Sequence, residues 1–179
     1  MSRLLFILSF LLLHIAAQAQ YITMVRTVWD DRFTEWEILD EETGESGEIR
    51  LRWTFPLDWT VWDIRWGDTT AEFSQTWRGN PEQWDLVMGT ERVTARTRWP
   101  GDYTEWRIRY MDETVIWKPV NQFNFEVWES EDLKRIPYRM YTLYEGDPRD
   151  WVIEDELRED AFPLRLLLIM LTIYHSTPK

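Results

Sequence analysis

Hydrophobic and polar positions alternate with a period of two along most of the chain after residue 20. Trp106, Ile108 and Tyr110, for example, alternate with Arg107 and Arg109. This alternation is typical of a strand in an antiparallel sheet that buries one of its faces. No apolar pattern with helical spacing persists among these segments. The same alternation appears in residues 48–53, 62–66, 84–88 and 92–99.

Tryptophan recurs in pairs within this alternation, and the residues after the second tryptophan of each pair are similar. The pairs are Trp29 and Trp36, Trp77 and Trp84, and Trp99 and Trp106, each seven residues apart, with Trp53 and Trp62 nine apart and Trp117 opening a fifth, less regular unit. Self-similarity at a period of about 20–26 residues indicates a repeated supersecondary unit. Glycine, proline, asparagine and aspartate fall between the strands, so each unit is predicted to be a β-hairpin.

The repeat therefore predicts an antiparallel meander of about ten strands over residues 20–128, forming a curved sheet or a closed barrel. An indole ring buries about 150–250 Å² when it is covered. We expect the tryptophans of the repeat to form its core. These are Trp29, Trp36, Trp53, Trp62, Trp77, Trp84, Trp99, Trp106 and Trp117.

The solvent face of the predicted strands carries charges of both signs. We expect opposite charges to pair across strands and to help set the register. The acidic members are Glu37, Asp63 and Asp85, and the basic members are Arg50, Arg52, Arg65, Arg96, Arg98, Arg107 and Arg109.

The last third of the chain has a different pattern. Residues 129–159 are predicted to hold one further strand, at 138–144, and a linker with a turn at Asp147 and Pro148. Residues 160–176 are predicted to form a helix with Asp160 as its N-cap and Pro163 in its first turn. Its apolar segment of eleven residues is too short to cross a bilayer, so we expect the helix to cover the tryptophan face or plug a barrel end. Residues 20–179 are thus predicted to be one all-β domain with a C-terminal helix.

The first 19 residues have the features of a secretory signal peptide. Arg3 precedes a short apolar stretch, and Ala17 and Ala19 form an A-x-A cleavage site. We therefore expect a bacterial protein that is periplasmic or secreted, with no transmembrane segment after cleavage. The chain contains no cysteine, so packing and not disulfide bonds must hold it. The net charge of −12 argues against nucleic acid or anionic lipid as a partner.

No set of residues with a catalytic pattern stands out. Cysteine is absent, and His175 is the one histidine beyond the predicted signal peptide. The carboxylates are numerous, but no pair has a spacing that indicates a glycosidase, and the calcium-loop spacing is missing. We therefore predict no catalytic residues, no metal site and no cofactor.

The sequence is most consistent with a structural or protein-binding module of the bacterial cell envelope. The first alternative is a carbohydrate-binding module that uses aromatic residues in loops, with Trp59, Phe55, Asp58 and Tyr103 as its candidates. Trp59 is chosen because it lies in the one loop that breaks the seven-residue spacing. A further alternative is a lipocalin-like barrel that carries an apolar ligand. An envelope protein and a glycan both remain open as the partner.

Overall fold

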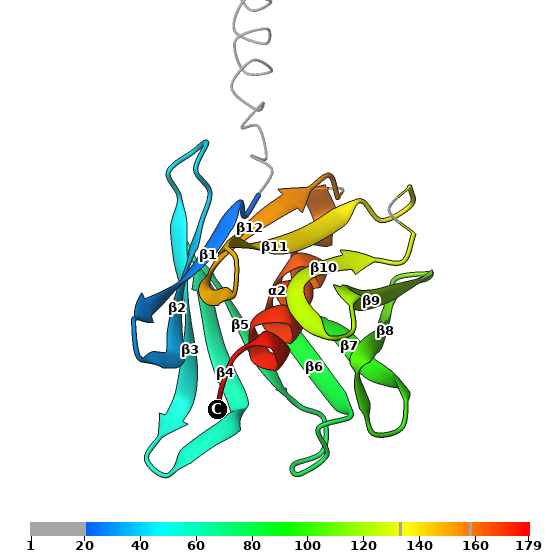
Figure 1. Ribbon diagram of the computed structural model, residues 1–179, viewed down its shortest axis with the longest axis horizontal. Coiled ribbons are helices and arrows are strands. Elements are labelled where there is room, and N and C mark those ends of the chain that lie inside the picture. Colours follow the sequence, from blue (N-terminus) through cyan, green and yellow to red (C-terminus); the bar gives the residue numbers. More distant parts are fainter. Residues whose placement is uncertain (1–20, 133, 158) are drawn as a thin grey trace, which may run out of the picture.

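A computed structural model describes residues 21–132, 134–157 and 159–179, and the predicted signal peptide lies outside these ranges. Within them, twelve antiparallel strands form a closed barrel in which each strand pairs with its sequence neighbours and β1 pairs with β12 (Figure 1). The strands are β1 Met24–Trp29, β2 Arg32–Leu39, β3 Ser46–Thr54, β4 Leu57–Trp66, β5 Thr69–Gln75, β6 Gln83–Met88, β7 Glu91–Trp99, β8 Asp102–Tyr110, β9 Glu113–Asn121, β10 Asn124–Ser130, β11 Tyr138–Tyr144 and β12 Asp147–Asp155. A 3₁₀ turn, Glu159–Ala161, then leads into α2, Phe162–Ser176. The predicted all-β meander with a C-terminal helix is confirmed, and its sheet closes.

The prediction for residues 129–159 is wrong in one respect. That segment holds two strands, β11 and β12, and the predicted turn at Asp147 and Pro148 is the beginning of β12. The turn itself is formed by Glu145 and Gly146, and Gly146 has a φ of +74°. Pro148 fits in β12 because it precedes the residues that pair with β1, and proline is tolerated near the start of a strand.

Helix α2 lies inside the ring of strands (Figure 1), and its residues from Phe162 to Tyr174 are buried on every side of the helix. A barrel of eight strands can fill its interior with its own side chains, whereas barrels of 16–18 strands leave a channel. The twelve-stranded barrel lies between these sizes, and α2 fills its interior. In the described ranges, no helix combines the length and the apolar character that crossing a bilayer requires.

The N-terminal half of α2 is held by a buried ion pair. The guanidinium group of Arg165 is fully buried and pairs with the carboxylate of Asp155 on β12, and its Nη2 donates to the Leu157 carbonyl at 2.8 Å. The predicted N-cap residue, Asp160, is one position too early. The capping position is Ala161, which has no side chain able to bond the helix N-terminus, while Pro163 lies in the first turn as predicted.

The outer wall carries the expected lattice of charges over part of its area. Arg52 on β3 pairs with Asp63 on β4, and Arg26 on β1 pairs with Glu37 on β2. Glu48 lies between two arginines of strands β3 and β4. The strands β7 and β8 depart from this arrangement, as described below.

Candidate binding rim

One structural motif recurs where each even-numbered strand begins. A tryptophan points into the barrel, and its Nε1 donates to the backbone carbonyl three residues earlier at 2.9–3.1 Å. We call these residues the inner tryptophans, and each is at most 2% exposed. They are Trp36, Trp62, Trp84, Trp106, Trp128 and Trp151. The repeat therefore continues through β11, which was predicted as a strand, and β12, which was predicted as a linker.

An aspartate or asparagine precedes most inner tryptophans by four residues. Its side-chain oxygen accepts a hydrogen bond from the backbone N–H two residues later, as in Asp102 with Thr104 at 2.9 Å. This local bond shapes the chain as it leaves the hairpin turn. The first unit departs from the pattern because Arg32 occupies the position. The residues that accept such a bond are Asp58, Asn80, Asp102, Asn124 and Asp147.

The turns that join β1–β2, β3–β4, β5–β6, β7–β8, β9–β10 and β11–β12 surround one mouth of the barrel, at which the C-terminal end of α2 lies (Figure 1). We call this end the hairpin rim. In the described part of the chain, each of these hairpins carries at least one exposed aromatic side chain. These rim aromatics are Trp29, Trp53, Phe55, Trp77, Trp99, Tyr103, Phe123 and Tyr144.

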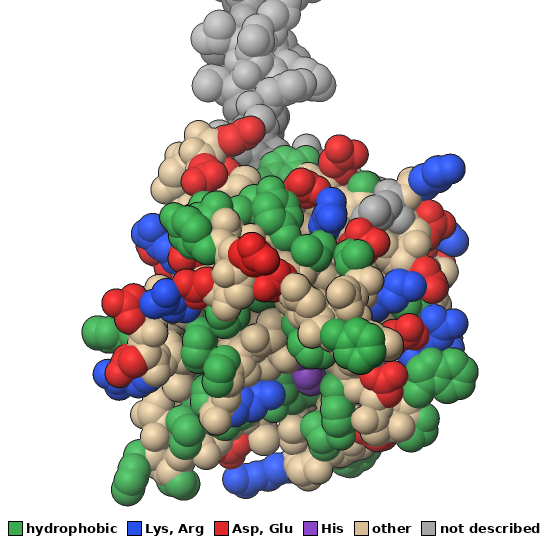
Figure 2. Space-filling model, in the orientation of Figure 1, with side chains coloured by type: hydrophobic (Ala, Val, Ile, Leu, Met, Phe, Trp, Pro, Cys, Tyr) green, Lys and Arg blue, Asp and Glu red, His purple; other side chains and the backbone are tan. Residues whose placement is uncertain are grey.

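The exposed large hydrophobic residues of the described ranges are concentrated at this rim. Met111, in the turn between β8 and β9, is the one exception at the opposite end of the barrel. Figure 2 shows hydrophobic side chains in separate groups over the molecule, with charged side chains between them. Clustering of exposed aromatic groups at one end of a molecule indicates an interaction surface.

The expected tryptophan core therefore divides into two sets. Trp36, Trp62, Trp84, Trp106 and Trp117 are buried. The prediction is wrong for the other members, because their exposed fractions range from 45% to 68%. These are Trp29, Trp53, Trp77 and Trp99. Each lies at or beside a turn of the hairpin rim.

A pocket of about 370 Å³ lies beside one rim aromatic, Trp53, between the β3–β4 hairpin and the loop after β5. Asp58 Oδ2 in this pocket pairs with Arg78 Nη2 at 3.1 Å. Hydrogen bonds from the Thr60 side chain and backbone, together with the charge of Arg78, lower the pKa of Asp58, so the carboxylate is ionised at neutral pH. Gln75 also lines the pocket. An indole face thus adjoins groups that can donate and accept hydrogen bonds.

The four predicted ligand-binding residues are not brought together into one site. Asp58 lines the Trp53 pocket, and Phe55 is 95% exposed at the tip of the same hairpin. Trp59 is partly buried, and its ring lies 5.6 Å from that of Trp62. Tyr103 lies in another hairpin. Trp53 was predicted to lie in the core, and Gln75 and Arg78 were not predicted as site residues, because nothing in the spacing shows that these two loops meet.

The centre of the hairpin rim is closed by the end of α2. The His175 ring lies 6.1 Å from that of Tyr103, nearly parallel to it, and 4.8 Å from that of Trp106. Burial, with a smaller contribution from the charge of Lys179, lowers the pKa of His175 to about 3, so this imidazole is neutral at physiological pH. Among the described residues, no group of three or more histidine, aspartate or glutamate side chains is placed to hold a metal ion.

Comparison of the chain with protein-family models, with curated proteins and with solved structures gives no match.

Proposed function

We propose that this protein is an exported, non-catalytic binding module of the bacterial cell envelope and that it contacts a polysaccharide through the rim aromatics. The observation that carries the proposal is the presence of an exposed aromatic side chain on each described hairpin of one rim. Because these hairpins surround a single mouth, a long or flat ligand can contact several of them together.

The polar and acidic groups around the rim aromatics favour a glycan over a protein. A sugar ring presents an apolar C–H face that stacks on an aromatic ring and hydroxyl groups that need hydrogen-bond partners around it. Trp53, with Asp58, Gln75 and Arg78 beside it, offers both kinds of group. The core of a protein interface is, in contrast, commonly apolar and depleted of charged residues, whereas acidic turn residues such as Asp30, Asp31 and Glu145 lie between the rim aromatics.

The interior of the barrel does not favour an apolar-ligand carrier. In a lipocalin-like protein the ligand occupies the middle of the barrel. Here that space is taken by α2, whose side chains from Leu166 to Leu171 are at most 1% exposed.

Affinity electrophoresis through gels that contain soluble glucans, xylans or mannans, together with pull-down on chitin, cellulose and peptidoglycan, tests the proposal. We expect at least one polysaccharide to retain the protein. Trp53→Ala and Trp99→Ala should each weaken that retention at least about tenfold with little change in unfolding temperature. Met111→Ala, which removes an exposed side chain at the opposite end, is the matched control and should bind normally.

Failure of every polysaccharide to retain the wild-type protein would contradict the proposal. So would binding that survives both tryptophan substitutions. Capture of an envelope protein that is lost in the same two variants would replace the glycan with a protein partner and leave the rim as the recognition surface.

A further inference from the structure

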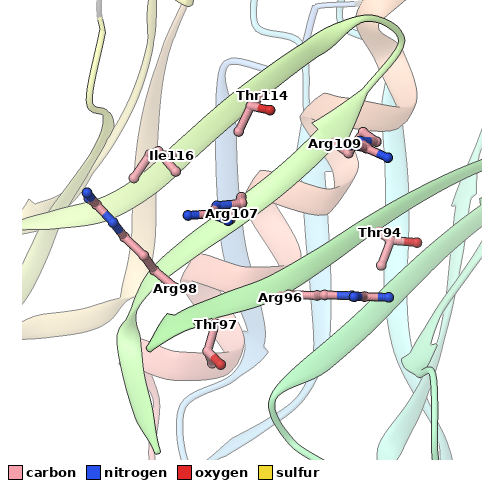
Figure 3. Close-up of a pocket in the computed structure, with 8 residues that line it drawn as sticks. All are labelled: Thr94, Arg96, Thr97, Arg98, Arg107, Arg109, Thr114 and Ile116. Carbon is pink, nitrogen blue, oxygen red and sulfur yellow. The ribbon is translucent and has the colours of Figure 1, made fainter. Parts of the chain in front are cut away.

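A second surface feature lies on the outer wall, away from the rim turns. A groove of about 730 Å³ runs over β7, β8 and β9 and is lined by arginine and threonine side chains. Figure 3 shows Arg96 and Arg109 extending toward the same side of the view, Arg107 on β8 nearer the middle of it, and Arg98 extending toward the opposite side. We call Arg96, Arg107 and Arg109 the groove arginines. All three are exposed.

The groove arginines have no acidic partner within 4.0 Å among the residues that the structure describes. The acids that border the groove are already engaged. Asp85 accepts from Arg92 at 3.0 Å and from the Thr94 hydroxyl. On the other side, Glu105 and Glu131 pair with Arg98, and Glu131 also pairs with Lys118.

The register makes this arrangement unfavourable for the unliganded protein. Arg96 on β7 is directly opposite Arg107 on β8, and Arg109 lies two residues further along the same face. Directly opposite residues on one face have Cβ atoms about 4.5–5.5 Å apart, and like charges at that separation destabilise the sheet. The repulsion is unexpected in a chain of net charge −12, in which acidic residues outnumber basic ones by 32 to 20. A bound anion would offset this repulsion.

We propose that the groove arginines form a binding site for a phosphate-bearing anion. A guanidinium group offers a planar set of N–H donors that matches phosphate oxygens in a bidentate manner. A tetrahedral phosphate has enough oxygens to accept from several guanidinium groups together. Thr94 and Thr114 add hydroxyl groups to the lining. Because the overall charge repels anions at long range, binding depends on direct contacts with the guanidinium groups, and salt weakens such contacts at exposed residues.

Isothermal titration with inorganic pyrophosphate at low salt tests the proposal, with sulfate as a competitor. Vesicles of phosphatidylglycerol form a second arm, which distinguishes a lipid headgroup from a soluble phosphate as the source. We expect saturable binding in at least one arm. The double variant Arg96→Gln with Arg107→Gln should weaken it at least about tenfold. Arg50→Gln removes an exposed arginine that is paired with Glu48 and should leave binding unchanged.

A second readout separates a binding role from a structural one. Without ligand, Arg107→Gln should raise the unfolding temperature because it removes the repulsion from Arg96, whereas Arg50→Gln should not. Absence of binding in both arms, binding that the double variant retains, or a lowered unfolding temperature in Arg107→Gln would each overturn the proposal. Binding of polyglutamate but of no phosphate would also overturn it, because the partner would then be an acidic protein. These outcomes are independent of the rim, whose tryptophans are not altered.

Discussion

The indole nitrogen of Trp117 on β9 donates to the hydroxyl oxygen of Thr172 in α2 at 3.1 Å, and both residues are fully buried. The Thr172 hydroxyl in turn donates to the Leu168 carbonyl at 2.9 Å. Trp117 differs from the inner tryptophans, because its N–H bonds to the helix and not to the carbonyl three residues earlier. This contact therefore connects the wall of the barrel directly to α2.

Removing the Thr172 hydroxyl should destabilise the protein by about 1–3 kcal/mol. Thr172→Val keeps the shape of the side chain but leaves the Trp117 N–H buried without an acceptor, and an unsatisfied buried donor has a cost of that size. Urea unfolding followed by circular dichroism would measure the free energy of unfolding.

Ser176→Ala is the matched control for this substitution. Trp128 Nε1 donates to Ser176 Oγ at 2.9 Å but also to the Phe125 carbonyl at 3.1 Å, so it keeps an acceptor when the hydroxyl is lost. We expect Ser176→Ala to lower the free energy of unfolding by less than about 1 kcal/mol. Equal effects of the two variants would mean that an unsatisfied Trp117 N–H does not account for the loss of stability in Thr172→Val.

The division between inner tryptophans and rim aromatics can be tested within one hairpin. Trp106 is fully buried, whereas Trp99, seven residues earlier, is 58% exposed. Trp106→Ala should lower the free energy of unfolding by about 3–5 kcal/mol, because it leaves a cavity in the core. Trp99→Ala should change it by about 0.5 kcal/mol or less. Chemical denaturation of both variants is the measurement, and a cost above 2 kcal/mol for Trp99→Ala would place its ring in the core after all.

The period-two pattern was enough to predict most of the strands, their antiparallel order and most of the buried face. The same pattern could not separate the two tryptophans of a hairpin. Trp99 and Trp106 lie on opposite sides of a turn, and the register between β7 and β8 shifts between Thr97 and Trp99. Whether a ring is covered depends on how far the hairpin extends past the helix, which is a long-range property of the closed barrel.

Two other features could not be predicted from the sequence pattern for similar reasons. Pro148 resembles a turn residue, so the sixth unit and its Trp151 were overlooked, although Tyr144 precedes Trp151 by the same seven residues. The arginines of β7 and β8 were expected to find acidic partners across the strands. The actual register places Arg96 opposite Arg107, and this follows from the pairing of the strands and not from the composition of either one.

The buried ion pair between Arg165 of α2 and Asp155 of β12 predicts that removing only one of the two charges destabilises the protein. Arg165→Met should lower the free energy of unfolding by about 3–5 kcal/mol, because it leaves the Asp155 carboxylate buried without its counter-charge. Burial already raises the pKa of Asp155, although the Arg165 hydrogen bond and charge oppose that shift. Thermal and urea unfolding would measure the loss.

Adding Asp155→Asn to Arg165→Met should restore a large part of the stability. The amide is neutral, and its oxygen can still accept from the Leu157 backbone N–H, which now bonds to Asp155 at 2.8 Å. A double variant as unstable as the single one would mean that packing of the arginine, and not the unpaired charge, accounts for the loss.

The neutral histidine at the rim predicts a specific loss of stability in acid. His175 is surrounded by the rings of Tyr103, Trp106 and Tyr174, and its pKa of about 3 lies well below the ordinary value of 6.5. Above pH 6.5 the residue is neutral in both the folded and the unfolded protein. As the pH falls below 6.5, the unfolded chain takes up a proton that the folded protein does not bind. The contribution of His175 to stability is therefore fully present above pH 6.5 and is lost as the pH falls toward 3.

His175→Phe should remove this pH dependence while keeping an aromatic ring among the surrounding aromatic side chains. As the pH falls from 6 to 4, we expect the free energy of unfolding of the variant to rise relative to that of the wild type by about 1 kcal/mol for each pH unit. Measurement at pH 8, where His175 is neutral in both states, isolates the effect of the substitution itself. The difference between the variant and the wild type cancels the titration of the carboxylates that both share. Parallel pH profiles for the two proteins would show that His175 is protonated in the folded state or that its ring is open to solvent.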